Sequence, residues 1–174
     1  MKNCIIALMC LLLAQPVFAF GSYKKLDFLN GESAPQSNKI LYEYVLQEQN
    51  MTHEEIKDFA RIEPQSVKAF EVDLNDDGTK EVLGVVYSTL YMGTAGYSLF
   101  ILQLQNGEYK NIAYVLNLEP QKGLKILNAK TNGYRHIKLN GSVAYKFKPF
   151  IAKYRNGYYK TDYQTKSLER ALQQ

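Results

Sequence analysis

Apolar side chains between residues 37 and 62 recur three or four positions apart, which is the spacing of one face of a helix. We therefore predict a helical part of the chain over 37–62. Its first helix is expected to run from an N-cap at Ser37 to about Asn50, because Ser is a preferred N-cap residue. The apolar face of this helix consists of Ile40, Leu41, Tyr44 and Val45.

A second, shorter helix is predicted to begin after Thr52. The segment Thr52-His53-Glu54-Glu55 has the form of a capping box, in which a Thr and the Glu three residues later satisfy each other's free backbone N–H groups. The apolar face of this helix consists of Ile56, Phe59 and Ala60. Pro64 then ends the helical region.

From Val67 onward the apolar pattern becomes that of β-strands, with runs rich in Val, Ile, Leu and Tyr. The expected strands are 67–73, 81–88, 97–105, 109–118, 124–130, 134–139, 142–154 and 158–163. Asn-Gly dipeptides separate several of them, at 106–107, 132–133, 140–141 and 156–157. Asn-Gly suits the type I′ turns of hairpins, because both central residues of that turn need a positive φ.

The predicted fold is α+β, with N-terminal helices packed on a mainly antiparallel β-sheet or sandwich of about seven or eight strands. The sheet region spans 67–163. Residues 20–37 contain Gly, Ser and Pro with little periodicity, so they are predicted to form an extended arm or loop. Residues 166–174 are expected to form a short helix or a frayed tail.

The first nineteen residues have the pattern of a cleaved secretory signal peptide. Lys2 precedes an apolar run over 5–14, which is too short to span a bilayer, and Val17-Phe18-Ala19 fits a cleavage site after Ala19. The mature chain is then one β-rich domain, 20–174, in the periplasm or secreted. Both cysteines lie within the signal, so we expect no disulfide-linked partner, and no further stretch is apolar enough for a membrane span.

Charge is unevenly distributed along the mature chain. Residues 20–119 carry eight Lys and Arg against fifteen Asp and Glu, whereas residues 120–174 carry twelve against two. This separation is compatible with ordinary solvated strand faces, or with a basic face for a polyanion or an acidic partner. Nucleic acid is not an expected partner, because the signal peptide directs the chain away from it.

The segment 73–81 is the strongest candidate for a metal site. It places oxygen-bearing side chains at alternating positions, with Gly78 allowing a sharp turn, and calcium prefers six to eight oxygen ligands. The predicted ligands are Asp73, Asn75, Asp77, Thr79 and Glu81. Gly84 stands where a full EF-hand loop needs a bidentate Glu, so we predict a short calcium loop between strands, with a metal-free hairpin turn as the alternative.

A glycine-flanked loop follows at 91–97, between two apolar strands. Gly93 and Gly96 are expected to supply backbone conformations that a side chain would forbid, and Thr94 and Tyr97 to supply contacts. Together with Tyr91 these residues form a predicted partner-binding loop, although a plain flexible connection is the alternative.

These two segments, followed by Ser98-Leu99-Phe100-Ile101-Leu102, resemble a group of bacterial periplasmic proteins and lipoproteins. In that group a D-x-N-x-D-G-x-x-E calcium loop precedes a glycine-rich loop bounded by two cysteines. Some are similar to periplasmic lysozyme inhibitors and serve as immunity proteins against secreted cell-wall hydrolases. The resemblance implies a β-rich fold and a calcium loop at 73–81. The loop cysteines would fall on Met92 and Tyr97, so this chain lacks that pair.

The sequence gives little support for catalysis. His53 and His136 are the only histidines, and no Gly-x-Ser-x-Gly, His-Glu-x-x-His or phosphate-loop motif is present. We therefore expect a non-enzymatic, calcium-binding periplasmic protein that binds and inhibits a protein partner such as a cell-wall hydrolase, with the 91–97 loop entering the partner's cleft. The alternative is a module that binds lipopolysaccharide, peptidoglycan or another envelope polyanion through its basic C-terminal sheet. The residues proposed for that role are Lys146, Lys148, Lys153, Arg155 and Lys160.

Overall fold

The computed structural model describes residues 22–94, 96–114, 116–143 and 146–171. The predicted signal peptide, its cleavage site at Ala19 and both cysteines lie outside these residues. The described chain contains three α-helices and eleven strands in two antiparallel sheets, so the predicted α+β class is confirmed. The helices are α1 (Pro35–Gln49), α2 (His53–Ala60) and α3 (Asp162–Ala171).

The first sheet has five strands in the order β1-β8-β9-β10-β11. Their bounds are Ser22–Leu26, Leu124–Thr131, Tyr134–Val143, Lys146–Arg155 and Tyr158–Thr161. The second sheet has six strands, in which β2, β3, β5 and β4 are neighbours in that order and β6 and β7 also pair with β5. Their bounds, from β2 to β7, are Val67–Val72, Glu81–Val86, Met92–Gly93, Gly96–Gln105, Glu108–Asn111 and Asn117–Leu118.

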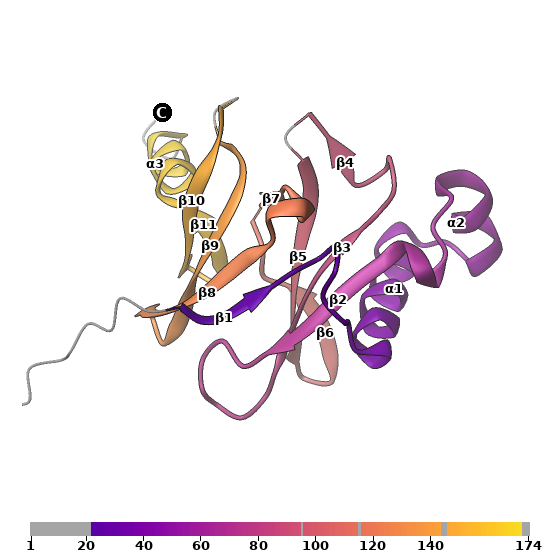
Figure 1. Ribbon diagram of the computed structural model, residues 1–174, viewed down its shortest axis with the longest axis horizontal. Coiled ribbons are helices and arrows are strands. Elements are labelled where there is room, and N and C mark those ends of the chain that lie inside the picture. The colour runs from indigo at the N-terminus through magenta and orange to yellow at the C-terminus, as the bar shows by residue number, and fades with distance from the viewer. Residues whose placement is uncertain (1–21, 95, 115, 144–145, 172–174) are drawn as a thin grey trace, which may run out of the picture.

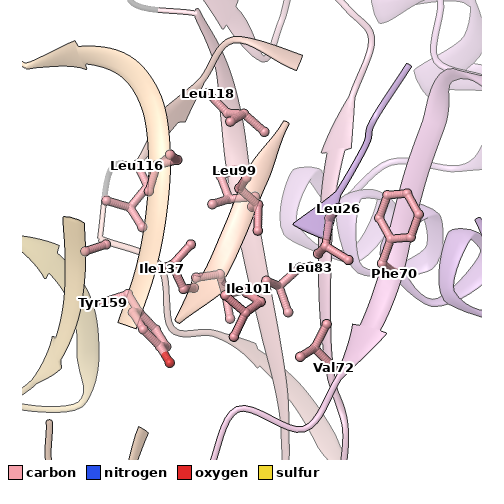
Figure 2. Close-up of a cluster of buried hydrophobic side chains, with 14 of the residues drawn as sticks. Leu26, Phe70, Val72, Leu83, Leu99, Ile101, Leu116, Leu118, Ile137 and Tyr159 are labelled. Carbon is pink, nitrogen blue, oxygen red and sulfur yellow. The ribbon is translucent and has the colours of Figure 1, made fainter. Parts of the chain in front are cut away.

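The main hydrophobic core lies between the two sheets (Figure 2). Leu83 and Val85 of β3 face this core, where they join Ile137 of β9 and Tyr159 of β11. Tyr159 is fully buried, and its hydroxyl donates a hydrogen bond of 2.8 Å to the backbone oxygen of Arg135. Every residue of β3 is buried, because the strand lies between β2 and β5 in a sheet with a core on each face.

A second core fills the space between the six-stranded sheet and the helices α1 and α2, which lie on the side of that sheet away from α3 (Figure 1). Gly84 of β3 allows α1 to approach closely. A Cβ at position 84 would lie 2.4 Å from Cδ2 of Leu41 and 2.8 Å from Cβ of Ala69. The glycine is therefore required by packing, and the sheet is covered on both faces.

The N-terminal helices differ from prediction in detail. The N-cap of α1 is Ala34, with Pro35 in the first turn, and Ser37 is buried inside the helix. The capping box at Thr52 and Glu55 is confirmed, because each side chain bonds the other's backbone N–H. Phe59 does not face the core, since it is 73% exposed.

Three of the four Asn-Gly turns are confirmed, with positive φ at both residues of 106–107, 132–133 and 156–157. The prediction for Asn140-Gly141 is wrong, because both residues lie inside β9. A Cβ at Gly141 would lie 2.1 Å from the backbone oxygen of Asn117, and Glu119 N donates a 2.9 Å hydrogen bond to Asn140 O. Gly141 therefore permits β7 of the other sheet to cross β9.

Other segments also depart from the predicted pattern. The expected arm at 20–37 contains β1, which pairs with β8. The expected strand 109–118 is divided into β6 and β7, and the C-terminal helix begins at Asp162 rather than near residue 166. No helix in the described ranges is both long and apolar enough to cross a membrane.

Candidate functional site

The 73–81 loop connects β2 to β3 and is held by hydrogen bonds to its own backbone. The two carboxylate oxygens of Asp73 accept hydrogen bonds from Asp76 N at 2.6 Å and from Gly78 N at 3.0 Å. Gly78 adopts a φ of 85°, the conformation expected at the sharp turn. Asp73 therefore organises the loop from its first position.

The next two predicted ligands bind each other. Asn75 Nδ2 donates to Asp77 Oδ2 at 2.7 Å, and Asn75 Oδ1 accepts from Asp77 N at 3.2 Å. Thr79 N donates to the other Asp77 oxygen at 2.7 Å, and the Thr79 side chain is exposed. Hydrogen bonds to Thr79 N and Asn75 hold the pKa of Asp77 below its ordinary value.

Glu81, the fifth predicted ligand, faces the interior. It is 1% exposed, and its carboxylate accepts hydrogen bonds from Leu74 N at 2.9 Å and Gln103 Nε2 at 3.2 Å. Burial raises the pKa of Glu81, and the nearby charge of Asp77 acts in the same direction. Gln103 Nε2 also donates to Tyr134 Oη at 2.5 Å, which links the two sheets.

The loop supplies side-chain oxygens of the kind that calcium prefers. Within the described ranges, no three or more His, Cys, Asp and Glu side chains lie close enough to hold a metal ion. Each carboxylate oxygen of Asp73, Asp77 and Glu81 already accepts a hydrogen bond. Each carboxylate oxygen has two lone pairs, so Asp77 can keep these hydrogen bonds and still coordinate a cation.

Asp76, which is not among the predicted ligands, points toward the other sheet. Both of its carboxylate oxygens accept hydrogen bonds from Arg135 Nη2, and Lys130 Nζ also pairs with it. Arg135 N donates to Leu74 O at 2.7 Å, and its guanidinium lies 4.0 Å from the ring centroid of Tyr23. The loop is thus attached to the five-stranded sheet.

The predicted partner-binding loop is a β-hairpin that projects beyond the six-stranded sheet (Figure 1). Met92 pairs with Tyr97, and Gly93 with Gly96. The side chain of Tyr91, before the hairpin, packs on Phe100 with ring centroids 5.2 Å apart. Its hydroxyl accepts from Gln49 Nε2 at 3.0 Å and donates to Glu48 Oε2 at 3.1 Å, so Tyr91 is tied to α1.

The other side of the hairpin is tied to the core between the sheets. Tyr97 packs on Tyr87 with centroids 5.3 Å apart, and Tyr87 Oη donates to Phe28 O at 2.7 Å. Gly96 has a φ of 107°, and a Cβ there would lie 2.7 Å from Leu118 O. The expected need for glycine is therefore confirmed at Gly96. It is wrong at Gly93, where φ is not positive and a Cβ would meet nothing within 4 Å.

The exposed part of the hairpin is its tip. Met92 is 45% exposed, and Gly93 and Thr94 are also exposed. A cavity of about 390 Å³ lies beside the tip, between the hairpin and the segment 118–122. Tyr91 and Tyr97 thus anchor the hairpin, whereas Met92 and Thr94 are the side chains available to a partner.

Two of the five basic residues proposed for polyanion binding are paired with an acid. Lys153 Nζ lies 3.3 Å and Arg155 Nη1 2.9 Å from the carboxylate oxygens of Asp162 in α3. Lys160 is buried, at 8% exposure. The side chains of Lys146 and Lys148 lie outside the described part of the chain.

Both histidines contact hydroxyl groups. His53 Nδ1 lies 3.3 Å from Tyr42 Oη, and the two rings pack with centroids 5.4 Å apart. His136 Nε2 lies 2.7 Å from Thr131 Oγ1. Burial, followed by the charge of Lys153, lowers the pKa of His136.

Comparisons of the chain with models of known protein families, with curated proteins and with solved structures find no match.

Proposed function

We propose that the protein is a non-enzymatic binding protein of the periplasm, or a secreted one, whose contact element is the 91–97 hairpin. The observation that carries this proposal is the contrast between the base and the tip of the hairpin. Tyr91 and Tyr97 are fixed to different layers of the fold, while Met92 and Thr94 are exposed. A projecting, well-anchored loop with an apolar side chain at its tip is typical of a protein-binding element.

A rigid hairpin favours this role, because the hairpin then loses little conformational entropy when it binds a partner. Pairing of Met92 with Tyr97 shapes the hairpin without a covalent link. The aromatic contact between Tyr91 and Phe100 stiffens its base. These contacts supply the stiffness that the cysteine pair would give in the proteins that the sequence resembles.

The partner that we propose is a cell-wall hydrolase, which the hairpin would inhibit by entering the substrate cleft. The tip carries no charged side chain, so it can enter a cleft without leaving an unpaired charge in the interface. The hairpin also belongs to the acidic part of the chain, 20–119, which would attract a basic hydrolase.

Calcium at the 73–81 loop is a further part of the proposal. Glu81 is a buried carboxylate with no ion pair to any described residue, and a cation beside it would offset the cost of its burial. The ion would be structural, because the loop joins the two strands β2 and β3.

The alternative of a polyanion-binding module has weaker support. A chain of anionic groups would need a row of free cations, whereas Lys153 and Arg155 share Asp162 and the Lys160 side chain is buried.

The proposal is tested by measuring how the protein affects peptidoglycan cleavage by a panel of purified muramidases. Wild type should inhibit at least one enzyme, and Met92→Asp with Thr94→Asp should weaken that inhibition at least about tenfold, because hairpin contacts at a cleft centre dominate binding. Phe59→Asp is the matched control, since Phe59 is also an exposed apolar residue but lies on α2. If no muramidase is inhibited, or if both variants inhibit like wild type, the proposal is wrong.

A further inference from the structure

A cavity of about 570 Å³ lies between the five-stranded sheet and α3, at the end of the molecule where α3 packs beside β10 (Figure 1). Arg155 and Lys160 line it from the two paired strands, and Thr131 lines it from β8. Thr165 and Leu168 of α3 form the opposite wall. None of the described lining residues is acidic.

Lys160 is the unusual residue of this cavity. Its side chain is only 8% exposed, yet its ammonium makes no hydrogen bond or ion pair with any residue that the structure describes. Its described contacts are two aromatic rings, with Nζ 5.5 Å from the ring centroid of Tyr114 and 5.7 Å from that of Tyr158. The stem of the side chain is buried, whereas Nζ keeps access to the space of the cavity, where an anion can reach it.

The neighbouring cations, unlike Lys160, each have an acidic partner. Lys153, which pairs with Lys160 across the two strands, contacts Asp162 instead. Arg155 Nη1 contacts the same carboxylate and donates to Thr165 Oγ1 at 3.2 Å, and a guanidinium has further N–H groups to offer. Asp162 is therefore shared by two cations, and it leaves Lys160 without a counter-ion.

The remaining polar groups of the cavity are of the kinds that bind oxyanions. Arg155 presents the N–H groups that Asp162 and Thr165 do not use. The hydroxyl of Thr131 lies 2.7 Å from His136 Nε2. The hydroxyl of Thr165 already donates to Thr161 O at 3.1 Å, so it is not a free donor. Lys160 and Arg155 come from adjacent strands and Thr131 from β8, so these donors gather at one end of the sheet instead of following a single strand. Such an arrangement suits one compact anion better than an extended chain of charges.

We infer that this cavity binds a small tetrahedral oxyanion, a phosphate or sulfate group that is either free or the end of a monoester, with Lys160 as its counter-ion. The site is independent of the proposed hairpin function, because it is built from β8, β10, β11 and α3 and contains no residue of 91–97.

The test is calorimetric titration of the whole protein with inorganic phosphate, against sodium chloride at equal ionic strength. Wild type should bind phosphate, and Lys160→Met should weaken that binding about 10- to 100-fold, the usual worth of a charged hydrogen bond. Lys166→Met is the matched control, since Lys166 is an exposed lysine of α3 and its loss changes the net charge equally. Lys166→Met and Met92→Asp should both bind phosphate like wild type.

Thermal melting checks that the variant folds, and nuclear magnetic resonance locates the phosphate site in wild type. Lys160→Met should fold, because Met keeps most of the apolar stem that Lys160 buries. If that variant does not fold, the site is located by nuclear magnetic resonance of wild type. The resonances that shift on adding phosphate should belong to residues 131–132, 155–160 and 165–168. Shifts spread over exposed lysines, equal binding by Lys160→Met, or no binding by wild type would each overturn the inference. Glycerol 1-phosphate, titrated in parallel, assigns the site to a monoester if it binds more tightly than phosphate, and to the free anion otherwise.

Discussion

Arg135 of β9 holds Asp76, in the loop between β2 and β3, through two hydrogen bonds from Nη2 to the two carboxylate oxygens, at 2.9 and 3.1 Å. The residues lie 59 positions apart in the sequence, and the contact joins one sheet to the other. It uses one acid from the acidic part of the chain and one base from the basic part. Acidic and basic residues from the two parts of the chain therefore pair at the surface, where the contact joins the two sheets.

This contact predicts how stability depends on pH. Hydrogen bonds from Lys130 and Arg135 lower the pKa of Asp76 from its ordinary value of 3.8. A lowered pKa in the folded state stabilises the protein above the unfolded value, and this contribution is lost as pH falls through the folded value. Asp76→Asn should therefore be less stable than wild type at pH 7, and the difference should vanish well below pH 3.8. Urea unfolding at both pH values measures it.

The control for this prediction is Asp58→Asn, because Asp58 is an exposed aspartate of α2 and the charge change is the same. Its stability should stay within about 0.5 kcal/mol of wild type at either pH. An Asp76→Asn protein that matched wild type at pH 7 would show that the contact does not stabilise the sheet pair.

Packing between α1 and the six-stranded sheet depends on Gly84. Gly84→Ala should lower the free energy of unfolding by about 1–3 kcal/mol, because the new Cβ would overlap Leu41 and Ala69. Gly93→Ala is the control, since a Cβ there meets nothing within 4 Å, and its effect should be below about 0.5 kcal/mol. Chemical denaturation gives both values. Equal effects at the two positions would contradict the close approach of α1.

Calcium binding has a thermodynamic consequence that can be measured without a partner. A free calcium concentration a hundred times the dissociation constant should stabilise chelator-treated wild type by about 2.7 kcal/mol. Asp77→Asn should reduce this gain, because it removes a charge from a predicted ligand while keeping an acceptor for Thr79 N. Asp58→Asn should keep the full gain. A melting temperature of wild type that does not respond to calcium would exclude the site.

The proposed location makes a separate prediction. If the signal peptide is recognised, the exported protein should begin at Phe20, because cleavage is expected after Ala19. Intact-mass spectrometry of protein recovered from the periplasm or the medium measures this directly. A mass that includes Met1 would contradict export with cleavage.

Local sequence signals predicted the parts of the fold that depend on neighbouring residues. The capping box at Thr52 and Glu55 and the turn at Asn106-Gly107 are determined within four residues, and both are confirmed. The strand β3 was predicted from its continuous apolar run, which needs burial on both faces. Asn140-Gly141 gave the same signal as the true turns, but there the glycine is needed for contact with Asn117 of the other sheet.

Features that depend on distant residues could not be predicted in this way. The strand β1 pairs with β8, about a hundred positions further along the chain, and its five residues show little alternation. The pairing of Asp76 with Arg135 and the burial of Lys160 beside Tyr114 have no local signal either. The uneven charge was interpreted as solvated strand faces or a basic face for a partner, and neither interpretation gives this contact.

Photo-crosslinking from the hairpin tests the proposed function most directly. A photo-reactive amino acid is placed at Met92 or, as a control, at Phe59, and each protein is irradiated with the muramidase that wild type inhibits most strongly. If the hairpin enters the substrate cleft, position 92 should crosslink to cleft residues, a substrate analogue should suppress the reaction, and position 59 should not crosslink. Crosslinks from position 59 alone, or crosslinks from position 92 that a substrate analogue leaves unchanged, would contradict the account.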